Sequence, residues 1–161
     1  MTSAKAVANT LTIQLRRTIP APRDEVFEAW LNPSVPGTPW NAAEKYIVDT
    51  KVDGLFYWTL KGTAHYGRFT AIDRPHRLQH TWVSPSTLGE ESTVTVTFDE
   101  HDGETLMTLV HSGLPDTERA PGHESGWNYF LGVFREQFGD GSRQKYRWED
   151  AHPSATNEQN K

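Results

Sequence analysis

The stretch that decides the fold is residues 127–138, WNYFLGVFREQF. Its large apolar side chains recur at intervals of three and four residues: Trp127, Phe130, Leu131, Phe134 and Phe138. This spacing is typical of one face of an α-helix and predicts a helix of roughly 15 to 20 residues. Gly139 and Gly141 follow the pattern and are expected to end the helix.

Residues 43–112, which precede this helix, have the period of antiparallel strands. Apolar and polar residues alternate there, and short turn sequences separate the runs. Asp53-Gly54 predicts a two-residue hairpin turn, and Asp102-Gly103 predicts a second one. The strands expected on either side of the turns are residues 46–52, 55–60, 63–72, 78–83, 92–98 and 105–111.

A further strand and a short helix are predicted nearer the N-terminus. Apolar and polar side chains alternate over Thr10–Ile19, which is typical of a half-buried strand, the first of seven. Pro22 suits the first turn of a helix because its missing N–H would have no partner there. Residues 23–31 predict a short amphipathic helix, and the proline-rich residues 32–40 predict a loop or a single irregular turn.

The order of these elements predicts an α+β fold: a seven-stranded curved antiparallel sheet around a long C-terminal helix, with short helices after the first strand. The last helix is the long apolar element available to cover one face of the sheet. One helix covers about 10 Å, which is less than the width of a twisted sheet of this size. We therefore expect the sheet to curl around the helix and to leave a cavity, lined by aromatic residues and a few polar groups.

The composition favours one compact cytoplasmic domain. The 161 residues fit one domain, which we place at residues 10–139 between polar tails at residues 1–9 and 140–161. Charged residues make up 23% of the chain and mean hydropathy is -0.67. No apolar run approaches the roughly 20 residues of a membrane span. The net charge of -5 argues against a nucleic-acid partner, and the lack of Cys excludes disulfides and thiolate metal sites.

Aromatic residues are the main candidates for a functional site. They make up 11% of the chain. Several come from elements that are expected to face one interior: Trp30, Trp40, Trp58, Tyr66, Trp82, Trp127 and Phe130. Such residues are most often plain core, but a core built largely of rings fills space poorly unless something else completes it. Buried indole and phenol groups also need hydrogen-bond partners, and a small aromatic or acyl ligand would supply both kinds of contact.

Two histidines extend this candidate site. His80 lies on the same side of its predicted strand as Trp82, and His111 shares a face with Met107 and Leu109. In a functional role, both imidazoles face the cavity as hydrogen-bond partners or acid–base groups for a ligand. In a structural role, they are half-buried and bonded to the backbone or to solvent. The residues by themselves are compatible with either role.

The other histidines are expected to be structural or exposed, because His65, His76, His101 and His123 lie near predicted turns or ends. His76 and His80 would be about 13 Å apart in an extended chain, too far to share a metal ion. The chain has no Gly-x-Ser-x-Gly elbow and no phosphate-binding glycine motif. Neither a metal, a cofactor nor a catalytic nucleophile is therefore expected.

Short segments in a fixed order carry a resemblance to a known family. They are IPAP at residues 19–22, VFEAW at 26–30, DGLFYW at 53–58, STVTV at 92–96, LVHSGL at 109–114 and GW at 126–127. Over residues 12–138 the chain resembles the START-like, helix-grip domains of the SRPBCC superfamily, and among them it is most similar to the homologues of the activator of Hsp90 ATPase. The resemblance implies a grip of antiparallel strands around the last helix with a hydrophobic cavity between them. It does not imply one activity.

Three functional hypotheses are compatible with the sequence. The preferred one is non-catalytic binding of a small hydrophobic or aromatic molecule between the last helix and the sheet. The walls of this binding site would be Trp58, Tyr66, Trp82 and Phe130. The polar end of the bound molecule would meet His80, His111 and Trp127. The resemblance implies a second one, a stress-related chaperone-interaction module. The eukaryotic co-chaperones carry an additional N-terminal domain, which the nine residues before Thr10 are not expected to supply. The third is a cyclase- or hydratase-type enzyme that uses a pocket histidine as acid–base.

Overall fold

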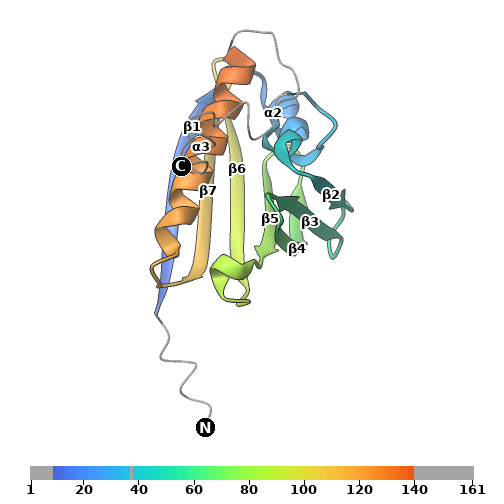
Figure 1. Cartoon of the computed structure of the whole chain (residues 1–161). Helices are drawn as coiled ribbons and strands as arrows, with labels where there is room; N and C mark the ends of the chain where they lie inside the picture. Colours follow the sequence, from blue (N-terminus) through green and yellow to red (C-terminus); the bar gives the residue numbers. More distant parts are fainter. Residues whose placement is uncertain (1–8, 37, 140–161) are drawn as a thin grey trace, which may run out of the picture.

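The computed structural model describes residues 9–36 and 38–139. They form a seven-stranded antiparallel sheet in the order β1-β7-β6-β5-β4-β3-β2. The strands are β1 (Thr10–Ile19), β2 (Lys45–Val48), β3 (Leu55–Leu60), β4 (Thr63–Asp73), β5 (Arg77–Trp82), β6 (Ser92–His101) and β7 (Glu104–Pro115). The sheet curves around one long helix, α3 (Ala120–Gly139), which confirms the predicted α+β architecture (Figure 1). Apart from Asn9, the tails expected at residues 1–9 and 140–161 lie outside the described residues.

Short helical segments join the strands. Helix α2 (Arg23–Leu31) follows β1 with the predicted bounds, and Asp24 and Glu25 lie in its first turn, where the helix dipole favours negative charge. The proline-rich segment after it contains a 3₁₀ turn, η1 (Pro39–Ala42). A second 3₁₀ turn, η2 (Pro85–Thr87), connects β5 to β6. The predicted short helix after the first strand is thus confirmed.

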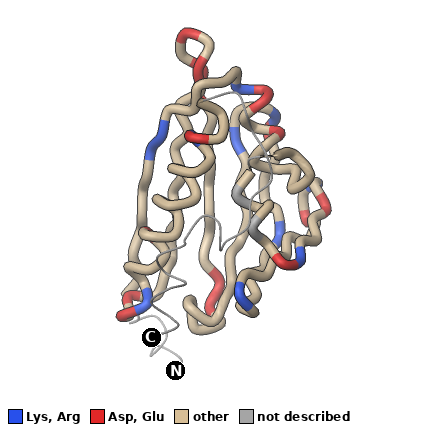
Figure 2. Tube along the Cα trace, turned by 45° about the horizontal axis from the view of Figure 1, so that its top comes forward, with Lys and Arg blue, Asp and Glu red and all other residues tan. Residues whose placement is uncertain are grey.

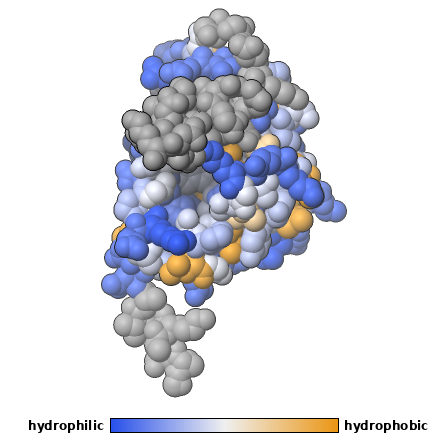
Figure 3. Space-filling view, in the orientation of Figure 1, coloured by the Kyte–Doolittle hydropathy of each residue, from blue (hydrophilic) through white to orange (hydrophobic). Residues whose placement is uncertain are grey.

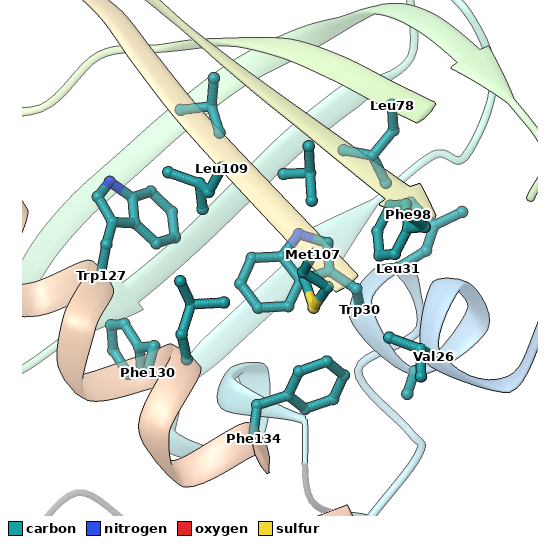
Figure 4. Packing of buried hydrophobic residues seen from close by; sticks show 14 of the residues in the cluster. Val26, Trp30, Leu31, Leu78, Phe98, Met107, Leu109, Trp127, Phe130 and Phe134 are labelled. Atoms are coloured by element: carbon teal, nitrogen blue, oxygen red, sulfur yellow. The ribbon is translucent and has the colours of Figure 1, made fainter. Parts of the chain in front are cut away.

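The core lies between the concave face of the sheet and the helices. In Figure 4, Met107 of β7, Trp30 of α2 and Phe134 of α3 point toward one another, and all three are buried. Residues 125–134 of α3 contain no charged side chain, and Figure 2 shows charged residues mainly in loops and near the ends of elements. This uncharged length of α3 allows the helix to lie against the apolar sheet.

The face of the molecule seen in Figure 3 is mainly polar. On the face shown in Figure 3, hydrophobic residues occupy small separate areas among hydrophilic ones. The exposed large hydrophobic residues among those described include Ile47, Val52, Leu55 and Leu88. Within the described part of the chain, no helix combines the length and the hydropathy that a bilayer crossing requires.

The connection between β2 and β3 differs from the predicted two-residue turn. It spans residues 49–54, and β2 ends at Val48 instead of residue 52. The N–H of Asp53 donates to the Phe69 carbonyl at 2.8 Å, and the Gly54 carbonyl accepts from the Phe69 N–H at 3.0 Å. Asp53 and Gly54 therefore pair with β4, in the two positions that immediately precede β3 in the chain. Gly54 is needed for close approach, because a Cβ there would lie 2.0 Å from a backbone carbonyl oxygen of the same loop.

The hairpin between β6 and β7 forms at the predicted turn. Asp102 and Gly103 have φ angles of 52° and 81°, as a two-residue turn of type I′ requires. Strand β7 continues past the predicted end at residue 111 to Pro115, because it pairs with β1 as far as Thr10. Pairing with the first strand of the chain is a long-range interaction, and the local sequence pattern does not contain it.

Candidate functional site

A cavity of about 240 Å³ lies between the N-terminal half of α3 and strands β3, β4 and β5, next to η2. Its walls are mainly aromatic, and a few polar side chains border it. The lining residues are Trp58, Leu60, His65, Trp82, Ser86, Arg119, Gly122, His123, Gly126, Trp127 and Phe130. Four of these were predicted as site residues: Trp58, Trp82, Trp127 and Phe130.

The aromatic wall is continuous from the sheet to the helix. Trp58 and Trp82 have ring centroids 6.1 Å apart, and Trp58 meets Phe130 of α3 edge to face at 5.9 Å. Trp82 lies 5.1 Å from Trp127 of α3. His65 stacks on Trp58 at 4.6 Å with the rings tilted by 17°. Each ring fixes its neighbours, so the wall is largely preorganised for a flat molecule.

The helix contributes open space as well as rings. Gly122 and Gly126 line the cavity from α3, one helical turn apart. A Cβ built on either glycine would meet no atom within 4 Å. The missing side chains at these two positions therefore add to the volume next to Trp127.

His111 is held in a chain of hydrogen bonds behind the aromatic wall. The indole N–H of Trp127 donates to Nδ1 of His111 at 3.0 Å. An indole N–H can only donate, so the proton of the neutral imidazole is on Nε2, which donates to the Ser92 hydroxyl at 2.8 Å. The Ser92 hydroxyl in turn donates to the Trp82 carbonyl at 2.9 Å. Both imidazole nitrogens are thus occupied, and the chain fixes the orientation of Trp127.

Burial keeps this imidazole neutral. His111 is fully buried, and burial lowers its pKa to about 3, with nearby His123 and His80 acting in the same direction. His111 is not among the residues that line the cavity. Of the two roles expected for His111, the structure therefore places it in the structural one, as a buried and fully bonded group.

His80 and Trp40 also lie behind the cavity, outside its lining. Burial lowers the pKa of His80 to about 4, and its Nδ1 bonds to the Thr81 carbonyl at 2.8 Å. The ring of His80 stacks on Phe56 at 4.6 Å. Trp40 is buried, and its indole N–H donates to the Trp30 carbonyl. Both residues are core groups that support the wall instead of forming it.

The prediction that Tyr66 faces the interior is wrong. Its side chain is 46% exposed. Tyr66 lies opposite Tyr57 in the β3–β4 register, whereas His65 lies opposite the buried Trp58. Successive side chains of a strand point to opposite faces, so β4 sends His65 inward and Tyr66 outward. Counting back by twos from Phe69, which is buried, would have given this assignment.

His123 was expected to be structural or exposed, but its side chain borders the cavity. The signal was present in the sequence, because His123 precedes Trp127 by four residues and Phe130 by seven, which is one helical face. Ser86 and Arg119 gave no comparable signal, since they lie in connections whose paths depend on the tertiary fold.

Most of the titratable groups that line the cavity carry no charge at pH 7. Burial lowers the pKa of His65 to about 4 and also lowers that of His123, and the proximity of the two imidazoles adds to the shift of His65. Both are neutral at pH 7. Among the described residues that line the cavity, Arg119 is then the one charged side chain. No three His, Asp or Glu side chains in the described ranges are grouped so that they could hold a metal ion.

Four buried side-chain nitrogens of the described lining residues have no hydrogen-bond partner: Nδ1 of His65 and of His123, and two indole donors. The indole Nε1 atoms of Trp58 and Trp82 are buried and make no hydrogen bond with the described residues. Both rings line the cavity. Buried polar groups are almost always paired in folded proteins, so these two donors mark where an acceptor is missing.

A curved antiparallel sheet that grips one long helix, with an aromatic cavity between them, defines the helix-grip class of α+β proteins. Within this class, the chain belongs to the family described as "Activator of Hsp90 ATPase homolog 1-like protein", whose model matches residues 20–139. The resemblance drawn from the sequence segments is confirmed.

The chain is also similar to individual proteins and solved structures. The chain is 26% identical over 138 residues to the uncharacterized protein C1711.08 of Schizosaccharomyces pombe, covering 85% of this chain and 40% of that protein. It therefore spans about two fifths of the curated relative that it matches. CalU16 of Micromonospora echinospora is 27% identical, covers 76% of this chain and 74% of its own, and has a TM-score of 0.61. An HSP90 activator from Plasmodium falciparum shares the fold, with 24% identity, 76% and 91% coverage and a TM-score of 0.66.

Proposed function

We propose that this protein binds a small hydrophobic or aromatic molecule in the cavity between α3 and the sheet, without catalysing its conversion. The observation that carries the proposal is the pair of unpartnered indole N–H groups, on Trp58 and Trp82, in an aromatic-walled cavity. A ligand ring would complete the packing of the wall, and a polar atom on the ligand would satisfy the donors.

The size of the cavity limits the ligand. A volume of about 240 Å³ is smaller than the roughly 300 to 1,000 Å³ of sites for drug-sized molecules, which favours a ligand of one or two fused rings. Burial of about 200 Å² of ring surface contributes about 5 kcal/mol at about 25 cal/mol per Å². With one or two hydrogen bonds and the cost of association, we expect Kd values between about 10 µM and 1 mM.

The imidazoles of His80 and His111, the two proposed as acid–base groups, give no support to the cyclase or hydratase hypothesis. A general acid or base works best with a pKa near the ambient pH. Burial instead lowers the pKa of His80 to about 4 and that of His111 to about 3. Neither residue lines the cavity, and both nitrogens of His111 are bonded within the protein. Binding therefore fits these groups better than acid–base chemistry.

The chaperone hypothesis rests on family membership instead of on a described site. Its test is stimulation of the ATPase of Hsp90 by the purified chain, and we expect none. If a variant with a filled cavity still stimulated the ATPase, the chaperone role would belong to a different surface. The binding proposal would then be decided by the ligand titrations alone.

The binding proposal is tested with probes of known shape. Indole, naphthalene and 2-naphthol are titrated into the protein by isothermal titration calorimetry, and the indole N–H signals are followed by heteronuclear NMR. We expect saturable binding of at least one probe, with larger shifts for Trp58 and Trp82 than for Trp30. No heat and no shift with any of the three, up to their solubility limits, would contradict the proposal.

A further inference from the structure

The charged group among the described lining residues, the Arg119 guanidinium, is a hydrogen-bond donor, and the lining also contains two unpartnered indole donors. We infer that the ligand is an aromatic carboxylate whose ring lies against the tryptophan wall and whose anionic group is received by Arg119 and the free indole N–H groups. This inference rests on the proposed function and gives the chemical class of the ligand. It is carried by the donors of Arg119, Trp58 and Trp82 and by the lack of a carboxylate among the described lining residues.

The local charge of the cavity is opposite to that of the chain. The protein has a net charge of -5, so an anion is repelled by the molecule as a whole. The described lining residues nevertheless include no Asp or Glu and include Arg119. A cationic ligand would find no counter-charge among these residues, whereas a carboxylate finds a guanidinium.

Arg119 is placed at the mouth of the cavity with donors to spare. It directly precedes α3, and its backbone N–H donates to the Thr117 hydroxyl at 3.2 Å. Its Nη1 donates to the Pro85 carbonyl of η2 at 3.4 Å, a long hydrogen bond across the edge of the cavity. A guanidinium has five N–H donors, so this single contact leaves most of them for a ligand.

The start of α3 adds to the same polarity. The first turn of α3 contains no acidic residue, and Gly122 of that turn lines the cavity. The N-terminus of a helix carries a partial positive charge, which favours a nearby anion. This field assists Arg119 and does not carry the inference alone.

The unpartnered indole groups of Trp58 and Trp82 call for a hydrogen-bond acceptor. An indole N–H can only donate, so neither a hydrocarbon nor an ammonium group satisfies Trp58 or Trp82. The indole of Trp127 is already satisfied by His111, which leaves two unpartnered indoles among the lining tryptophans. His65 and His123 are neutral at pH 7 because burial lowers their pKa, so they add no charge to that of Arg119.

The test compares three probes with the same ring: 2-naphthoate, 2-naphthalenemethanol and 2-naphthylmethylammonium. Calorimetry at pH 7 and low salt should rank the anion first and the cation last, with at least a tenfold difference in Kd between them. Arg119→Gln should weaken 2-naphthoate by about fivefold, the scale of an exposed charge-assisted hydrogen bond. It should change the affinity for the alcohol less than twofold.

Arg135→Gln is the matched control, because Arg135 is an exposed arginine of α3 that does not line the cavity. It should leave all three affinities unchanged. As a second readout, the indole N–H proton of Trp58 or Trp82 should move to lower field with 2-naphthoate. Equal affinity for the cation, or an unchanged Kd for 2-naphthoate in Arg119→Gln, would overturn the inference while leaving the proposed function in place. No binding of any probe would overturn both.

Discussion

The substitution Gly126→Leu tests whether filling the cavity abolishes ligand binding while the fold stays stable. Gly126 is half-buried in α3 and lines the cavity, and a Cβ there meets no atom within 4 Å. A leucine side chain at this position would therefore begin in open space at the cavity wall. It occupies the space that we assign to a ligand.

The expected change in stability follows from two terms of the same sign. Replacing glycine within a helix gains about 0.5 to 1 kcal/mol of helix propensity. Partial burial of the leucine side chain against the aromatic wall adds about 1 kcal/mol, less than the roughly 1.5 to 3 kcal/mol of full burial. A gain of about 1.5 to 2 kcal/mol in the free energy of unfolding corresponds to a rise in Tm of about 3 to 8 °C.

The assay measures both properties on the same preparation. Thermal unfolding followed by circular dichroism should show the higher Tm, and calorimetry with 2-naphthol should show at least a tenfold loss of affinity. Gly132→Leu is the matched control, because Gly132 is in the same helix with the same open surroundings but does not line the cavity. The control should keep the affinity of the parent protein.

Three outcomes would refute this reasoning. A lower Tm for Gly126→Leu would mean that the position has no room for a side chain. An unchanged affinity for 2-naphthol in a stabilised Gly126→Leu would mean that the ligand binds elsewhere. If Gly132→Leu weakened binding equally, the effect would belong to the helix and not to the cavity.

Three further predictions concern the residues around the site. Ser92→Ala leaves Nε2–H of His111 without its acceptor and should cost about 1 to 3 kcal/mol in urea unfolding; an unchanged midpoint would contradict the hydrogen-bond chain. Burial lowers the pKa of His80 to about 4 and of His111 to about 3, so the unfolded chain binds more protons in acid. Stability should therefore be level above about pH 7 and fall from about pH 6.5 to 4, by up to about 1.4 kcal/mol per pH unit for each histidine. Equal urea midpoints at pH 7 and 5 would argue against this. Tyr66→Ser should change stability by less than about 0.5 kcal/mol and leave calorimetric affinities unchanged, whereas a large loss of affinity would return Tyr66 to the site.

The order and type of the elements could be predicted from the sequence, because both depend on local periodicity. The three-and-four spacing from Trp127 to Phe138 gave the helix, and alternation gave the strands. Errors arose where a distant strand decides the outcome. Asp53-Gly54 has the composition of a hairpin turn but pairs with Phe69, and β7 extends because β1 lies beside it.

The candidate site was predicted only in part, for a related reason. Trp58, Trp82, Trp127 and Phe130 line the cavity, and each has a clear place in an alternating or helical pattern of the sequence. For β4, an error of one residue exchanged Tyr66 for His65. Alternation counted back from Phe69 leads to His65, whereas the burial of Phe69 itself is decided by the packing of the sheet.

The sequence by itself determined that strands surround a helix rich in aromatic residues, since 3.6-residue and two-residue periods are properties of the chain alone. Only the tertiary structure decided which buried polar groups are left without a hydrogen-bond partner. His111 is satisfied because Trp127 and Ser92, from separate elements, reach its two nitrogens. The indoles of Trp58 and Trp82 meet no such partner among the described residues. Hydrogen bonds depend on positions in space to within a fraction of an ångström, and those positions are set by packing between distant segments.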